Sequence, residues 1–220
     1  TGWLRSEHHQ SGEVIVTARQ RSEELQSVPA QVTAFTAQMI ENKGVTMPRD
    51  FIQSTPNVTL VETQNAGTTF VVIRGISQAR NSSPSVSVVV DGVPQTQPEQ
   101  FNQELADIKQ IQVLKGPQGA LYGRNAIGGA IIIDTVDPSD HFEGSARAGV
   151  GNGVSEKAKV AVSGPIDSAG TLRYRASVNY FNTDGYLNNS YLGKKADPDE
   201  DYSARLRLLW KPADQFSADF

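Results

Sequence analysis

The sequence predicts two parts: an α+β domain, with a mixed sheet and short helices, up to about Pro138, and antiparallel transmembrane β-barrel strands after it. Three observations carry this prediction. Short Val- and Ile-rich runs alternate with helical segments before Pro138. Polar and apolar residues alternate strictly in several segments after His141. No run approaches the roughly 18 apolar residues that a membrane-spanning helix needs.

The first part contains signals for two helices and several strands. PAQVTAFT predicts a strand, and TAQMIENKG predicts a helix with Thr36 as its N-cap and Gly44 as its stop. MPRDFIQSTPN predicts a second helix with Pro48 in its first turn. TTFVVIRGI, SVSVVVDGV, IKQIQVLKG and GGAIIIDTV predict strands, and Asp91-Gly92 predicts a turn. Because continuous Val and Ile runs typically have both faces covered, we expect a compact domain of roughly 120 residues.

The second part alternates in the manner of membrane strands. In TLRYRASVNYF, YSARLRLLW and EKAKVAVSG, apolar residues share one face and Arg, Lys, Ser or Asn the other. A soluble antiparallel sheet also alternates, but Tyr180 and Tyr202 beside the long polar loop, with Trp210 at the short-turn end, match aromatic girdles. A lipid-facing Arg costs roughly 2–4 kcal/mol, so the arginines must face a wet interior. Burial of Val178, Leu206 and Leu208 inside a soluble core would contradict this interpretation.

The glycine-rich segment LKGPQGALYGRNAIGGAIII is not a phosphate loop. Gly123 is followed by Arg124 and Asn125, where such a loop needs Lys and Ser or Thr. Gly116, Gly119 and Gly123 are also spaced three and four apart, which breaks the dinucleotide fingerprint. We expect these glycines to serve tight backbone turns.

Composition excludes several classes of protein. The net charge of −4 lacks the basic footprint of nucleic-acid binding, and the absence of cysteine excludes disulfide scaffolds and thiolate zinc sites. No catalytic motif is present, so we expect no enzyme and no built-in cofactor or metal site. His8 and His9 lack a third ligand. The acidic run ADPDED is followed by Tyr202, at the position where a calcium loop needs glycine. We therefore expect this run to be a solvated outer loop.

Several segments, in order, resemble the N-terminal part of a TonB-dependent outer-membrane receptor of the iron-complex type. They are EVIVTARQRSEELQSVPAQVTAFTAQMI, DFIQSTPNV, VVIRGI, VVVDGVP and ELADIKQIQVLKGPQGALYGRNAIGGAIIIDT. The family pairs a plug with a 22-stranded barrel. The resemblance implies a periplasmic tail at 1–11, a plug at 12–138 and about five barrel strands at 139–220. Because about five strands cannot close a barrel, the chain is expected to be a fragment.

The resemblance also assigns roles to individual residues. The TonB box matches Glu13, Val14, Ile15, Val16, Thr17 and Ala18, an extended segment suited to adding as a strand to a partner's sheet. Arg74 and Lys115 match two plug arginines that lock the plug to barrel glutamates, although lysine offers only a point charge. Outward loops that contact the ligand match 62–68, 77–84 and 94–102. Their candidate residues are Gln64, Asn65, Gln78, Arg80, Asn81, Gln95, Gln97, Phe101 and Asn102.

The implied function is energised uptake of a scarce polar small molecule, such as a ferric siderophore, across the outer membrane of a Gram-negative bacterium. The plug and N-terminus would face the periplasm, and the implied partners are TonB, with ExbB and ExbD, and outer-membrane lipid. An iron chelate is a common family ligand, but the sequence leaves the ligand open. The alternative is a non-transporting ligand-binding or signalling fragment of such a receptor. Twelve residues before Glu13 are too few for the extra domain of signalling receptors, which disfavours that alternative.

Overall fold

The computed structural model describes residues 15–16, 23–24, 31–62, 69–78, 82–97, 101, 104–123, 125–152, 154–213 and 215–220. The chain forms two compact units. The first comprises Thr1–Lys43, Phe51–Phe101 and Gln110–Ile133, and the second comprises Gly44–Asp50, Asn102–Lys109 and Asp134–Phe220. Among the described residues, no helix has the length and apolar character needed to cross a membrane.

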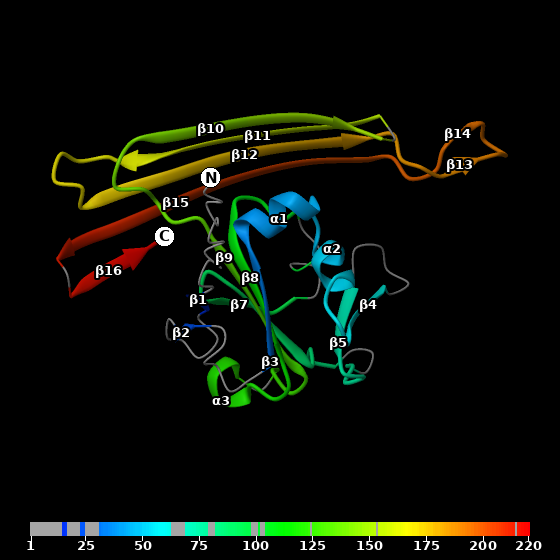
Figure 1. Ribbon diagram of the computed structural model, residues 1–220, viewed down its shortest axis with the longest axis horizontal. Coiled ribbons are helices and arrows are strands. Elements are labelled where there is room, and N and C mark those ends of the chain that lie inside the picture. The colour runs from blue at the N-terminus through cyan, green and yellow to red at the C-terminus, as the bar shows by residue number, and fades with distance from the viewer. Residues whose placement is uncertain are drawn as a thin grey trace, which may run out of the picture. The chain divides into compact units, whose positions relative to one another are not determined.

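A five-stranded mixed sheet organises the first unit (Figure 1). The outer pairs β3–β8 and β6–β7 are antiparallel, whereas β6 and β9 are parallel, which confirms the predicted mixed sheet. Asp91 and Gly92 have φ values of 47° and 80°, as the two-residue turn between β6 and β7 requires. In sheet order, the strands are β3 (Gln31–Thr36), β8 (Ile108–Lys115), β9 (Gly129–Thr135), β6 (Val86–Val90) and β7 (Val93–Gln95).

The helix α1 (Ala37–Lys43) has the predicted ends. The Thr36 Oγ1 atom accepts a hydrogen bond from the Met39 backbone N–H at 3.3 Å, which caps the first turn. Gly44 follows the helix with a φ of 63°, a conformation that glycine adopts without strain. Local signals therefore suffice to place this helix.

The helix α2 (Pro48–Gln53) begins with proline, as predicted. The Asp50 carboxylate accepts hydrogen bonds from the backbone N–H groups of Thr46 at 2.8 Å and Met47 at 2.9 Å. A negative side chain in the first turn also suits the positive end of the helix dipole.

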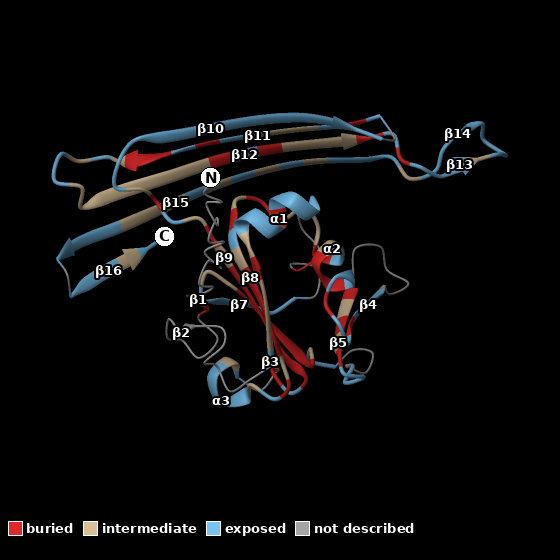
Figure 2. Cartoon of the chain, viewed as in Figure 1, coloured by how far each residue is buried: buried red, intermediate tan, exposed pale blue. Residues whose placement is uncertain are grey.

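A two-stranded ribbon, β4 (Val58–Glu62) and β5 (Thr69–Ile73), also belongs to the first unit. The sequence analysis did not identify β4. The expectation that every Val/Ile run has both faces covered is wrong for β5, in which buried and half-buried residues alternate. By contrast, β9 is buried at six of its seven positions (Figure 2), as expected.

The glycine-rich connection between β8 and β9 forms turns, as expected. It contains the short helix α3 (Gly119–Tyr122), and Gly116 and Gly123 have positive φ values of 108° and 80°. A Cβ atom on Gly129 would lie 2.2 Å from the Leu114 carbonyl oxygen, so no side chain fits there. The glycines thus allow β8 and β9 to approach closely.

The second unit is built on a five-stranded antiparallel sheet. Its long connection carries a small hairpin that projects beyond the ends of the long strands (Figure 1). In order, the sheet strands are β10 (Glu143–Gly151), β11 (Ser155–Pro165), β12 (Leu172–Thr183), β15 (Asp199–Ala213) and β16 (Phe216–Asp219), and the hairpin strands are β13 (Asn188–Asn189) and β14 (Lys194–Lys195).

In strands β12 and β15, the two faces of this sheet are inverted relative to a water-soluble protein. Val178 and Leu206 on the apolar face are 58% and 63% exposed, whereas Ser177 and Asn179 on the polar face are 4% and 3% exposed. The predicted alternation is therefore present, with the apolar side outward. A sheet that exposes its apolar face and covers its polar face suits lipid better than water.

The aromatic residues lie at the predicted ends of the strands. Tyr180 and Tyr202 are directly opposite each other, with ring centroids 4.9 Å apart. Trp210 packs edge-on against Phe216 at 5.6 Å, at the opposite ends of these strands. This separation matches the two interfacial belts of a membrane sheet.

Two arginines face each other on the polar face. Arg175 on β12 lies directly opposite Arg207 on β15, and like charges in this position repel. The Asp107 carboxylate accepts hydrogen bonds from Arg175 Nε at 2.5 Å and from Nη2 at 2.7 Å, and Glu143 adds a contact at 3.2 Å. Arg175 is therefore held by carboxylates rather than simply exposed to water.

Arg207 is compensated in the same way. Its guanidinium binds Asp219, with Nη2 2.5 Å from the carboxylate, and its Nη1 lies 3.1 Å from Asp137. The same Nη1 donates to the Thr135 carbonyl oxygen at 3.3 Å. Carboxylates on both arginines thus offset the repulsion across the strand pair.

Candidate functional site

Of the residues that match the TonB box, the structure describes Ile15 and Val16. Glu13, Val14, Thr17 and Ala18 lie outside the described residues. β1 (Ile15–Val16) pairs antiparallel with β2 (Glu23–Glu24). The Val16 side chain is fully buried in a cluster with Leu114, Ala130 and Ile132.

This arrangement restrains the segment. One backbone edge of β1 is already used by β2, and Val16 must leave its cluster before the chain can move away. Burial of a valine side chain contributes about 1.5–3 kcal/mol, whereas each backbone hydrogen bond to a partner contributes only about 0.5–1.5 kcal/mol net. Release of Val16 is therefore a substantial part of the cost of any strand addition here.

A pocket lies between the β4–β5 ribbon and the β6–β7 hairpin. Of the nine predicted ligand residues, Gln64, Asn65, Arg80, Asn81 and Asn102 lie outside the described residues. The other four all line this one pocket: Gln78, Gln95, Gln97 and Phe101. The structure thus brings together residues from two of the three predicted loops.

The pocket is small, and none of the described residues that line it is charged. Its volume of about 30 Å³ has room for roughly two water molecules. Phe101 is buried and packs edge-on against Phe51 with ring centroids 6.3 Å apart. Its ring belongs to the core and also forms a pocket wall.

The sequence analysis missed one polar residue of the pocket, Thr69. Its side chain is 6% exposed, and within the described part of the chain its Oγ1 atom has no hydrogen-bond partner. A threonine at the start of a strand gives no sequence signal that separates this position from an ordinary strand residue. Only the packing around Thr69 identifies it.

Strands β6 and β9 separate the pocket from Val16. Val86 and Val88 of β6 line the pocket, and Val88 pairs with Ile131 of β9. Neighbouring residues of a strand point to opposite faces, so Ala130 and Ile132 project to the other face, where they pack against Val16. The two predicted sites therefore lie on opposite faces of the same strand pair.

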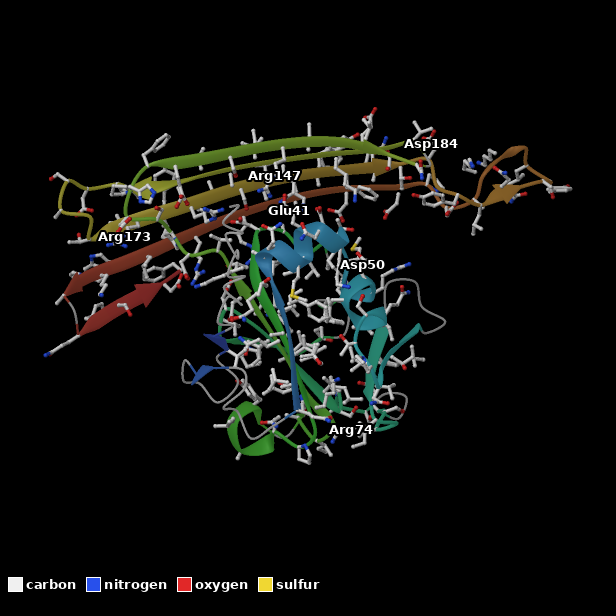
Figure 3. All side chains as sticks on the ribbon, in the orientation of Figure 1. Glu41, Asp50, Arg74, Arg147, Arg173 and Asp184 are labelled. Atoms are coloured by element: carbon white, nitrogen blue, oxygen red, sulfur yellow. The ribbon has the colours of Figure 1, made fainter. Side chains whose placement is uncertain are left out.

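Arg74 and Lys115 are brought close to each other. Arg74 lies in the turn after β5 (Figure 3), with a φ of 54° and its N–H donating to the Asn57 carbonyl at 2.9 Å. Its guanidinium donates to the Gln31 side-chain oxygen, and Gln31 is the register partner of Lys115. Burial and then the charge of Arg74 lower the pKa of Lys115.

Two cations side by side can attract an anionic partner. Neither Arg74 nor Lys115 forms a salt bridge with any carboxylate of the described ranges. Their assignment as a plug–barrel lock stays a prediction.

The long connection after β12 is an ordered loop. The Asp197 carboxylate accepts hydrogen bonds from the backbone N–H groups of Tyr186 at 3.0 Å and Leu187 at 2.8 Å. These backbone hydrogen bonds, the one from Tyr186 first, lower the pKa of Asp197. Asp197 therefore caps its own loop, which gives this member of the acidic ADPDED run a structural role.

Other predicted features concern metal and histidine. Within the described ranges, no group of three or more His, Cys, Asp or Glu side chains could hold a metal ion. His8 and His9 lie outside those ranges. His141 contacts Asp140, with its Nδ1 atom 2.8 Å from the carboxylate.

Comparisons with known proteins agree with this geometry. The family model described as TonB-dependent Receptor Plug Domain matches residues 24–130. The pesticin receptor of Yersinia pestis is 32% identical over 162 residues, which cover 73% of this chain and 24% of that protein. The vitamin B12 transporter BtuB of Vibrio vulnificus is 30% identical over 157 residues, covering 68% and 25%. The chain thus spans about a quarter of the length of these relatives.

Solved structures show the same arrangement of strands. The ferric yersiniabactin uptake receptor FyuA from Yersinia pestis has a TM-score of 0.75 and 29% identity, covering 84% of this chain and 29% of that one. The pyoverdine receptor FpvA of Pseudomonas aeruginosa has a TM-score of 0.74 at 20% identity, a likeness of fold alone, covering 96% and 30%. With its plug domain and the first strands of a barrel, the chain belongs to the family of TonB-dependent outer-membrane receptors.

Proposed function

We propose that the chain is part of a receptor that takes up a scarce polar ligand, such as a ferric siderophore, across the outer membrane of a Gram-negative bacterium. Relatives are named for siderophore and vitamin B12 uptake. The pesticin receptor and FyuA share enough identity to make an iron chelate the first ligand to test. The ligand contacts the plug at the pocket lined by Gln78, Gln95 and Gln97.

The partner of the N-terminal segment is the periplasmic domain of TonB. The box, Glu13–Ala18, adds as a strand to a sheet edge of TonB, because an extended β-branched segment suits that mode of recognition. ExbB and ExbD supply the energy through TonB. Release of Val16 from its cluster precedes this pairing, because the segment cannot leave β2 while that side chain stays buried.

The observation that supports the proposal is that the pocket and Val16 lie on opposite faces of β6 and β9. A ligand that shifts Val86 or Val88 acts on strands that also hold Val16. Packed strands transmit such shifts because cores are close-packed. Ligand occupancy on one side then weakens the hold on the box on the other side.

The second unit anchors the receptor in lipid. The apolar face, which includes Val178 and Leu206, contacts the hydrocarbon. The opposite face, which carries Arg175 and Arg207, points away from the lipid. The long loop between β12 and β15 then emerges on one side of the membrane, beyond the Tyr180–Tyr202 pair.

The test is uptake of radioactive iron by cells that express the gene in its native length. Ferric yersiniabactin is the first probe, followed by other iron chelates and by vitamin B12. We expect uptake of one of these that is lost on deletion of Glu13–Ala18 and in a strain without TonB. Binding of a probe without any TonB-dependent uptake would instead support a non-transporting binding or signalling role.

A further inference from the structure

One face of the second sheet carries a positive charge in every cross-strand row over most of its height. The strands β10, β11, β12 and β15 pair in continuous register, so residues directly opposite one another form rows across the sheet. Successive rows of one face lie two residues apart, which is roughly 7 Å along a strand. Row by row, the cations are Arg173, then Arg175 and Arg207, then Arg205, then Arg147 and Lys159, and then Lys157. We call these residues the cation track.

The cation track is confined to the face that points away from the lipid. The structure describes these four strands throughout, and the alternate rows between the cations contain only Gly, Ala, Val, Leu and Tyr. Neighbouring residues of a strand point to opposite faces, so the charges are sorted completely by face. In the rows of the cation track, the carboxylates that belong to the four strands are Glu143 and Asp201. The strands by themselves therefore present a positively charged wall.

Carboxylates from outside these four strands bind the cation track. Arg175 donates two hydrogen bonds to the Asp107 carboxylate, at 2.5 and 2.7 Å, and the two side chains are only 11% and 12% exposed. Arg207 Nη1 lies 3.1 Å from the Asp137 carboxylate. Asp107 belongs to the range that matches the plug-domain model. The wall thus already recognises a carboxylate through the two-pronged geometry that a guanidinium group favours.

A carboxylate of a ligand can take the place of Asp107 without leaving Arg175 unpaired. Removing one partner of a buried ion pair is costly, because the remaining charge is left uncompensated. Exchange of one carboxylate for another avoids this cost, whereas an uncharged or cationic group cannot provide it. Pores that select anions use Arg and Lys side chains along their walls in the same way. With rows roughly 7 Å apart, an anion that leaves one row is close to the next.

The last row of the cation track, at the ends of the strands next to the long loop, has space beside it. Lys157 Nζ lies 5.3 Å from the centre of the Phe181 ring. The residue opposite Lys157 on β10 is Gly149, where an added Cβ atom would meet no other atom within 4 Å. A group that approaches Lys157 above Gly149 therefore meets a charge and no blocking side chain.

We propose that the cation track guides a negatively charged ligand along the wall of the barrel, and that Asp107 and Asp137 hold the places of the ligand's anionic groups in the resting receptor. The proposal rests on the proposed function, because it takes the chain to be part of an uptake receptor with a water-filled interior. It adds the class of ligand, which is a chelate that exposes a carboxylate or a similar anionic group on its surface.

The first measurement uses two thiol reagents of opposite charge. Gly149→Cys is introduced into the gene at its native length, after any other cysteine has been replaced by serine, and the receptor is studied in outer membranes. The rate of modification by an anionic sulfonatoethyl methanethiosulfonate is divided by the rate for its cationic trimethylammonium counterpart. Relative to a free thiol, this ratio should be at least about threefold higher at 0.1 M salt.

Further variants show whether the cation track causes this preference. Adding Lys157→Gln should lower the ratio by about threefold, because a charge roughly 7 Å away is removed. Adding Lys211→Gln, at the other end of β15, should leave the ratio unchanged, because that distance exceeds the screening length of about 10 Å. Ala148→Cys, made alone, places a thiol on the lipid-facing side and should react with neither charged reagent.

The second measurement tests the class of ligand with two ferric complexes of equal coordination. Ferric desferrioxamine B ends in an ammonium group, and its N-succinyl derivative ends in a carboxylate. The anionic complex should slow modification of the Gly149→Cys thiol by an uncharged methanethiosulfonate, and the cationic complex should not. Lys157→Gln should raise the concentration needed for half-maximal protection by at least about threefold.

The proposal is overturned by a reagent ratio no higher than that of a free thiol, by equal protection or no protection from the two complexes, or by a thiol that no reagent reaches. None of these readouts involves uptake or TonB. If the preference for anions is found while deletion of Glu13–Ala18 leaves uptake intact, the proposed function fails and the cation track stands. TonB-dependent uptake without a preference for anions removes only the cation track.

Discussion

Burial of Val16 predicts that the N-terminal segment is held back from its partner. Substitution Val16→Ala removes two methyl groups from a side chain that is fully buried against Leu114, Ala130 and Ile132. The backbone pairing of β1 with β2 is left unchanged. The variant therefore weakens the hold on the segment without cutting the segment.

The size of the effect follows from the buried groups. Each buried carbon group contributes about 0.8 kcal/mol, so two of them lower the cost of release by about 1.6 kcal/mol. Since 1.4 kcal/mol corresponds to tenfold in an equilibrium constant, the affinity of the chain for the periplasmic domain of TonB should rise by roughly tenfold to fifteenfold. A cavity left at the site would add to this gain.

The assay must distinguish two contributions to affinity: the release of Val16 from its cluster and the direct contact of the segment with TonB. Affinities are measured by titration calorimetry for the chain and for a synthetic peptide of residues 11–20, each with Val or Ala at position 16. The peptide is not held by the plug, so it reports only the direct contact. The ratio of chain to peptide affinity should rise by roughly tenfold in the variant. An equal change in chain and peptide would refute the idea that Val16 holds the segment back.

Three further predictions concern charge and loop structure. Asp107→Asn removes the carboxylate that binds Arg175, which then faces Arg207 with only a neutral amide as its partner. The free energy of unfolding, measured in urea, should therefore fall by about 2 kcal/mol. An unchanged unfolding midpoint would show that the ion pair is dispensable. Lys115→Met should raise the melting temperature at neutral pH. The pKa of Lys115 is lowered in the folded state. Between this lowered pKa and the unfolded value of 10.5, the unfolded state therefore binds more protons, and the stability of the wild type should rise with pH. This rise in stability should be absent from the variant. Gly185→Ala places a Cβ atom 2.4 Å from the Asp197 carbonyl oxygen at a φ of 86°, so the protection factors of the loop amides, which compare each exchange rate with that of an unstructured chain at the same pH, should fall. In the wild type, the same protection factors should fall when acid passes below the lowered pKa of Asp197 and protonates the cap. Unchanged protection factors in the variant and in acid would show that the cap does not order the loop.

Features set by neighbouring residues could be predicted from the sequence. The cap at Thr36, the stop at Gly44 and the turn at Asp91-Gly92 each depend on residues a few positions apart. The alternation in β12 and β15 likewise fixes which residues share a face, because side-chain direction along a strand has a period of two. These local rules need no knowledge of the rest of the fold.

Features set by distant residues could not be predicted. The contact between Asp107 and Arg175 joins positions 68 residues apart, and nothing near either residue in the sequence indicates the other. The burial of Thr69 and of Val16 depends in the same way on segments that meet only after folding. The resemblance placed Gln78, Gln95 and Gln97 in loops implied to contact ligand, but their convergence on one cavity required the structure.

The inverted faces of the second sheet are the central claim, and a spin-label experiment tests them most directly. The 220 residues contain no cysteine, and any cysteine that the gene encodes elsewhere is first replaced by serine. The single substitutions Val178→Cys, Leu206→Cys and Asn179→Cys can then each carry one nitroxide, with the gene expressed at its native length in outer membranes. Molecular oxygen concentrates in lipid, so it should relax the labels at 178 and 206, whereas a water-soluble nickel chelate should not reach them. The label at 179 should show no such preference for oxygen. Stronger relaxation by the nickel chelate than by oxygen at both 178 and 206 would contradict the account.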